Sequence, residues 1–294
     1  MDYGKLVNHA FELSWKHKIL WILGFFASTF FFSGSGLDEQ IKSRPWEHWT
    51  ELQLAILVLA VSAIVIIGLF LFIMQLISVA GLIEAVVRIE NGQAYKLGEM
   101  FKVGARHFWR YLGLFCLFFL VTGSSIILLV GIIVLGFVFL HWYGLIILVL
   151  LLPILFAVIF FFGNMYSLAQ REIVAGGLPV FDAVSEAYRL ITRHLGPNII
   201  MFFITFFLGI GIMLVGVLLL AAFAIPVLLV ATVSTAALIV SLVIAIPVFL
   251  ALAIMIEGCL GTFFNALFTL FYLELRKLTP RTMPTVDSTP SAQA

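Results

Sequence analysis

Charged residues are scarce in this chain. Only 11% of its 294 residues are Asp, Glu, Lys or Arg, whereas 63% are hydrophobic and 30 are Phe. The mean hydropathy is +1.20. Soluble domains are about half apolar and about one quarter charged. The composition therefore excludes a water-soluble globular protein.

Other scarcities exclude classes of partner and site. The 16 Lys and Arg residues nearly balance the 15 Asp and Glu residues, so the net charge of +1 leaves no basic excess to bind nucleic acid. Cys116 and Cys259 both lie in apolar runs, which leaves no disulfide scaffold or cysteine-rich zinc site. No His pair has metal-ligand spacing, and no Gly-rich phosphate loop or nucleophile elbow occurs. We therefore expect no metal, no cofactor and no enzymatic activity.

The chain instead contains long stretches without charge. A transmembrane helix needs about 20 apolar residues. The stretch at residues 111–170 is long enough for two spans, which join near residues 141–144. Glu257 alone separates the stretches at residues 194–256 and 258–273. Pro226 and residues 232–235 predict a turn in this region. Residues 236–272 are then predicted to form one long helix. We therefore predict an all-α, polytopic integral membrane protein with six transmembrane helices. The stretches are residues 19–37, 52–83, 111–170, 194–256 and 258–273.

The basic residues are distributed unevenly between the two predicted sides. Fourteen of the 16 Lys and Arg residues lie on the side of the termini, and only Lys42 and Arg44 lie on the other. The positive-inside rule then places both termini in the cytoplasm of a prokaryotic cell with the chain in its inner membrane. A cleavable signal peptide in residues 1–36 is the alternative for the first span, but Asp2 and Glu12 are atypical of its charged region.

One sequence pattern recurs three times. Residues 5–17 align with residues 99–111 and 182–194, and a span follows each copy. We predict three repeat units over residues 3–92, 96–177 and 179–277, followed by a disordered cytoplasmic tail at 278–294. The aligned positions hold small residues (Ala10, Gly104, Ala187), basic residues (Lys16, Arg110, Arg193) and polar rings (His17, Tyr111, His194).

Each unit is predicted to begin with an amphipathic helix. In the third copy apolar residues recur at three- and four-residue steps, and charged residues occupy the other face. Asn91-Gly92 and Gly176-Gly177 are typical helix stops, and Pro179 is typical of a helix start. Each unit then consists of an interfacial helix, an elbow, an outgoing span and a returning span. Alternatively, and compatibly, the three helices pack on one another as a cytoplasmic layer. The predicted interfacial anchors are Trp15, Lys16, His17, Trp109, Arg110, Arg193 and His194.

Glu257 is the sharpest candidate for a functional site. A charged side chain in the middle of a span costs about 2.5 to 3.5 kcal/mol, so it normally faces protein or water. Glu257 shares a helix face with Gly261 and Asn265 at four-residue spacing. Three interpretations of Glu257 remain open. It is a substrate or proton site, or it is a protonated side chain that joins helices by hydrogen bonds, or it lies nearer the outer surface of the membrane. Its candidate partners are Gln75, Asn164 and the cluster at residues 122–125.

Several motifs carry a family resemblance. Ser14-Trp-Lys-His-Lys-Ile-Leu-Trp21 and Gly176-Gly-Leu-Pro-Val-Phe-Asp-Ala183, with Leu168-Ala-Gln-Arg171 before the latter, resemble uncharacterised prokaryotic membrane families similar to the membrane domain of glycerophosphoryl diester phosphodiesterases. The resemblance covers most of residues 1–277 and includes no catalytic residue. A separate soluble barrel performs the hydrolysis in that arrangement, so the resemblance implies a membrane module without the hydrolase.

Two functions follow from these observations. Low intramembrane polarity favours a non-enzymatic membrane scaffold or assembly factor whose cytoplasmic amphipathic layer binds membrane lipids or protein partners. The alternative is a small-solute or lipid transporter that uses the Glu257 region. A water-accessible cavity that reaches Glu257 would favour transport, whereas a dry bundle would oppose it.

Overall fold

The computed structural model describes residues 1–28, 51–140, 144–231 and 234–279. Within these ranges the regular elements are all helical, so the prediction of an all-α protein is confirmed. The elements are α1 (Tyr3–Lys16), the 3-10 helix η1 (Lys18–Leu20), α2 (Trp21–Ser28), α4 (Glu51–Glu90), α5 (Leu97–Leu140), α6 (Gly144–Val174), α7 (Val180–Arg193), α8 (Leu195–Ala231) and α9 (Thr235–Leu278).

Among the described residues, five helices are long and apolar enough to cross a membrane: α4, α5, α6, α8 and α9. They match the second to sixth predicted spans, and they make the chain a multi-pass membrane protein. The first predicted span, residues 19–37, begins with α2, and its remainder lies outside the described residues. The segment that carries Lys42 and Arg44, the turn predicted near 141–144 and the predicted tail also lie wholly or mostly outside them.

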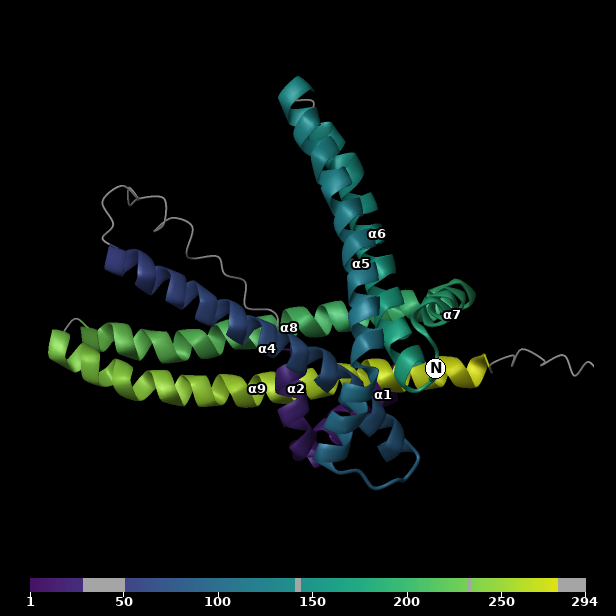
Figure 1. Cartoon of the computed structure of the whole chain (residues 1–294), viewed down its shortest axis with the longest axis horizontal. Coiled ribbons are helices and arrows are strands. Elements are labelled where there is room, and N and C mark those ends of the chain that lie inside the picture. Colours follow the sequence, from purple (N-terminus) through teal and green to yellow (C-terminus); the bar gives the residue numbers. More distant parts are fainter. Residues whose placement is uncertain (29–50, 141–143, 232–233, 280–294) are drawn as a thin grey trace, which may run out of the picture.

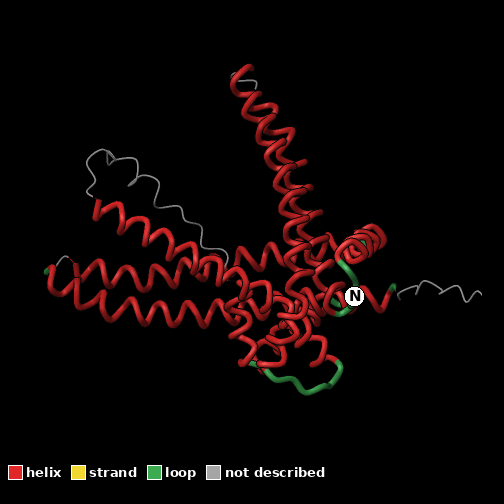
Figure 2. The backbone as a smooth tube through the Cα atoms, in the orientation of Figure 1, coloured by secondary structure: helices red, strands yellow, loops and turns green. Residues whose placement is uncertain are grey.

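The helices form a common base from which three arms extend (Figure 1). The base contains α1, α2 and α7, together with the segments 76–90, 97–118, 164–174, 195–201 and 258–279 of the longer helices. The arms are the outer part of α4, the α5–α6 hairpin and the α8–α9 hairpin (Figure 2). The hydrophobic core cluster lies in the base, and large exposed apolar side chains cover the arms. The arms therefore present lipid-compatible surfaces, while buried packing holds the base together.

The predicted helix boundaries are reproduced at several turns. Gly92 and Gly177 follow α4 and α6 with φ values of 67° and 69°, a conformation that glycine adopts without steric cost. Pro179 is the N-cap of α7 in an extended conformation. Local backbone chemistry is sufficient to end the returning helices at these points.

Two of the three predicted elbows are present. The chain breaks at His17 and at His194, which occupy the same position in the first and third copies of the pattern. The elbow predicted near Trp109 and Arg110 is wrong, because α5 continues without interruption through Tyr111. The N-terminal part of α5 therefore extends its span instead of forming a separate helix.

The packing of the base follows a cyclic order. Helix α4 packs on α5, α6 packs on α7, and α9 packs on α1 and α2. Each of these pairs joins a returning helix to the helix that opens another unit. The aligned small residues Ala10, Gly104 and Ala187 are all buried, and Gly104 packs against Ile77 of α4.

The aligned polar rings make comparable hydrogen bonds. His17 Nδ1 lies 2.8 Å from the Tyr95 hydroxyl, just after α4. The Tyr111 hydroxyl donates to the Gln170 carbonyl of α6 at 3.0 Å. His194 Nε2 lies 2.6 Å from the Thr279 hydroxyl, just after α9. The partners of the three rings thus lie near the C-terminal ends of α4, α6 and α9.

Candidate functional site

A network of buried and partly buried charges joins three helices in the base. Arg276 on α9 donates to Glu172 on α6, and its Nη1 donates to Glu186 on α7 at 2.9 Å. Arg189, also on α7, donates to Glu186 at 2.7 Å. Glu172 is fully buried. Because an uncompensated charge in an apolar interior is strongly unfavourable, this network fixes α7 to α6 and α9.

The surroundings of Glu186 stabilise its charged form. Partial burial by itself would raise its pKa, but the hydrogen bond and positive charge of Arg276, together with Arg189, hold the pKa of Glu186 below its usual value. Sequence analysis missed this network. The charges at 172 and 276 were visible only as the ends of returning helices, and no sequence spacing relates them to Glu186.

Arg171 is a second buried cation that the sequence did not identify as a site. Its Nη1 donates to the Ser167 carbonyl at 2.5 Å and to the Ser167 hydroxyl at 2.8 Å, and its Nη2 donates to the Asn265 carbonyl at 3.4 Å. The guanidinium also lies over the Phe268 ring. These contacts near the C-terminal end of α6 pair the two terminal nitrogens of Arg171 with carbonyl groups and connect α6 to α9, while its buried Nε makes no hydrogen bond with the described residues.

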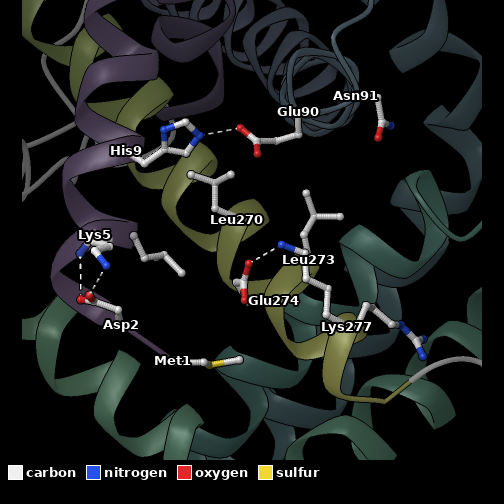
Figure 3. A pocket seen from close by; sticks show the side chains of 12 residues that line it. Met1, Asp2, Lys5, His9, Glu90, Asn91, Leu270, Leu273, Glu274 and Lys277 are labelled. Atoms are coloured by element: carbon white, nitrogen blue, oxygen red, sulfur yellow. Dashed lines mark hydrogen bonds and ion pairs between the residues drawn. The ribbon is translucent and has the colours of Figure 1, made fainter.

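A cavity of about 680 Å³ opens in the base between α1 and the C-terminal ends of α4 and α9 (Figure 3). Its acidic residues face basic ones in pairs. Lys5 Nζ lies 3.2 Å from Asp2, His9 Nε2 lies 2.7 Å from Glu90, and Lys277 Nζ lies 2.5 Å from Glu274. Each acidic side chain of the lining thus has a basic partner within the protein, and Arg276, which also lines the cavity, bonds to Glu172 and Glu186.

Glu257 lines a groove of about 1270 Å³ between α8 and α9. Every other side chain along this groove is apolar, or the residue is glycine. The Glu257 carbonyl accepts a hydrogen bond from the Ser28 hydroxyl at 3.5 Å. Among the residues that the structure describes, none makes a hydrogen bond or ion pair with the Glu257 carboxylate. The groove thus combines an apolar surface with one acidic group.

The predicted partners of Glu257 bond elsewhere. Gln75 donates to the Ala27 carbonyl at 3.3 Å. Asn164 and Asn265 donate to the carbonyls four residues earlier in their own helices, at 2.9 and 3.0 Å. Ser124 and Ser125 likewise bond within α5. Polar side chains can satisfy themselves on their own helix in this way, so these residues do not converge on Glu257.

Glu257, Gly261 and Asn265 share one face of α9 but contact different parts of the protein. Gly261 packs so closely on α2 that an added Cβ would lie 2.1 Å from the Gly24 carbonyl oxygen. The Asn265 carbonyl accepts from Arg171 and from the Thr269 hydroxyl. Of these three residues, Glu257 is the one that lines the groove between α8 and α9.

The predicted interfacial anchors divide into exposed and bonded residues. Trp15 and Trp109 are 53% and 76% exposed, and Lys18 Nζ lies 5.4 Å from the Trp15 ring. Arg110 donates to the Gly177 carbonyl at 3.1 Å. Lys16, which pairs with Glu12, and Arg193 are exposed. His17 and His194 are half-buried and bonded as described above, so they position elements rather than contact the surroundings.

Within the described ranges, no group of three or more His, Cys, Asp or Glu side chains is placed to hold a metal ion. Comparisons of the chain with protein-family models, with curated proteins and with solved structures find no match. The arrangement of these residues is therefore the basis for a functional interpretation.

Proposed function

We propose that this protein is a non-enzymatic membrane scaffold or assembly factor. Its base binds lipid headgroups or protein partners at the membrane surface, and its arms anchor it in the bilayer. The proposal includes six spans in three related units, both termini in the cytoplasm and residence in a prokaryotic inner membrane. The cyclic packing of the base and the aligned bonds of His17, Tyr111 and His194 support the three-unit organisation.

The distribution of buried side chains carries the proposal. Packing and buried charges are concentrated in the base, whereas the described parts of the arms expose apolar side chains on most of their surface. A transporter needs polar groups along a solute path through the membrane. The groove at Glu257 has only that one polar side chain. The geometry is thus better suited to holding partners than to passing a polar solute.

The exposed aromatic side chains of the base are the surface that such a scaffold would use. Phe181 and Tyr188 on α7 are 76% and 53% exposed, although the opposite face of α7 is buried at Ala183 and Ala187. Aromatic and basic residues of this kind anchor helices at the headgroup boundary or form the centre of a protein interface.

Site-specific photocrosslinking in native membranes tests the proposal. A photoreactive residue at Phe181 or Tyr188 should give a reproducible protein adduct of discrete mass or a lipid-headgroup adduct. The matched control is Val138 in the α5 arm, which is 62% exposed and should give only acyl-chain adducts. Absence of any position-specific adduct at the base would contradict a scaffold.

The alternative function is transport of a small solute or lipid, and the carboxylate of Glu257, which has no partner among the described residues, favours it. Purified protein in vesicles should then support proton or solute flux that is lost in Glu257→Gln, since an amide cannot take up and release a proton near neutral pH. A scaffold predicts no flux above empty vesicles for either protein.

A further inference from the structure

We propose that the groove between α8 and α9 binds a transmembrane helix of a partner protein, and that a Lys or Arg on that helix pairs with Glu257. This inference rests on the proposed scaffold function and names the class of partner that the arm region holds.

The length of the groove fits a helix. On α8 its lining begins at Ile200 and continues to Leu219 at steps of three and four residues. At 1.5 Å per residue this stripe is about 30 Å long, which matches the hydrocarbon thickness of a bilayer. One lipid chain covers only one leaflet, about half of that distance. An apolar helix covers the whole stripe.

The groove has space for close approach of a helix at the depth of Glu257. Phe223 contacts Phe249 across the hairpin with ring centroids 5.5 Å apart. Because α8 and α9 run antiparallel, Gly216, seven residues before Phe223, lies at about the level of Ile256 and Glu257. A Cβ added at Gly211 or Gly216 would meet nothing within 4 Å. By contrast, Gly24, Gly104 and Gly261 are already filled by neighbouring backbone.

The charge of the groove specifies the partner. A carboxylate within a span is costly unless it finds a partner, and Glu257 finds none among the described residues. A basic side chain on the incoming helix would supply that partner and would be strongly favoured in a surrounding of low polarity. An all-apolar helix or a second copy of α8 would leave the carboxylate unpaired, since residues 195–231 contain no basic residue.

The test measures binding of designed helices to the full-length protein in phosphatidylcholine vesicles by energy transfer. The probe is a span-length polyleucine helix with one central Lys, and the matched probes carry a central Leu or Glu. We expect the Lys helix to bind tightest and the Glu helix weakest. In Glu257→Gln the Lys helix should lose about five- to thirty-fold in affinity, the range expected for one polar contact between membrane helices. Glu257→Asp should retain most of the affinity.

Glycine variants test the groove itself. Gly216→Leu fills the groove and should abolish binding of the Lys helix. Gly209→Leu is the matched control, because Gly209 also has open space around it but does not line the groove. Equal binding of the three helices to the unmodified protein would overturn the inference without requiring any variant to fold. So would equal effects of the two glycine variants, or energy transfer only between copies of the protein.

The outcomes separate this inference from the scaffold proposal. Glu257-dependent flux through vesicles would contradict the scaffold function. Absence of flux combined with failure to select the Lys helix would contradict only the helix site, and photocrosslinking at Phe181 or Tyr188 would still test the base.

Discussion

Arg276 Nη1 lies 2.9 Å from Glu186 Oε1, and this contact joins the last spanning helix to the amphipathic helix α7. The same guanidinium donates to the fully buried Glu172, so one side chain neutralises acids on two other helices. Besides its buried apolar face, α7 is therefore tied to the base by one residue that lies 90 positions away from Glu186 in the sequence.

Replacing Arg276 with Met should destabilise the protein by about 3 kcal/mol, because a buried acid then loses its cationic partner. The control is Lys277→Met. Lys277 also has an acidic partner, Glu274, but its side chain is 71% exposed, so its loss should cost less than about 1 kcal/mol. Reversible unfolding in mixed micelles measures both changes. Equal losses in the two variants would mean that the network does not stabilise the base.

Stability should also depend on the ionisation of Glu186. Its pKa is lowered on folding, so its contribution is fully present above its ordinary pKa of 4.5 and is lost as the pH falls through the lower folded value. The difference in melting temperature between the native protein and Glu186→Gln should therefore be constant near neutral pH and shrink below about pH 4.5. If this difference in melting temperature instead grew in acid, the pKa of Glu186 would be raised on folding rather than lowered.

Gly104→Ala should weaken the packing of α5 on α4. The added Cβ would lie 2.1 Å from the Ile77 carbonyl oxygen, and backbone cannot move aside cheaply. We expect a loss of about 1 to 3 kcal/mol. Gly123→Ala lies in the same helix with no atom within 4 Å of the new Cβ, so it should be neutral or slightly stabilising through helix propensity. Thermal unfolding of both variants decides whether close contact, rather than loss of glycine, is responsible.

The predicted topology can be tested by cysteine labelling in a version without Cys116 and Cys259. Cysteines at Lys102 and Ser185, which are exposed in the base, should react with an impermeant reagent only after cell lysis. A cysteine at Glu51, exposed at the far end of the α4 arm, should react in intact cells. Met100 also lies in the base, but it is not suitable as a labelling position because its side chain is fully buried. Labelling of the base positions in intact cells would invert the topology.

The sequence by itself determined the class of the protein and its local boundaries. Long uncharged stretches predicted the five apolar helices, since a bilayer core admits few charges. Gly92, Gly177 and Pro179 predicted the ends and the start of helices, because those positions depend on backbone conformation over a few residues. The breaks at His17 and His194 were likewise visible as an aligned pattern.

Only the tertiary structure decided which side chains meet. The continuity of α5 through Tyr111 contradicts the predicted elbow. The contact of Arg276 with Glu172 and Glu186 depends on the packing of three helices, which no single-helix periodicity encodes. Glu257 was identifiable as an embedded acid, but its place on an apolar groove depends on how α8 and α9 separate along their length. Hydropathy and backbone preferences are local, whereas partner choice requires complementary surfaces brought together from distant parts of the chain.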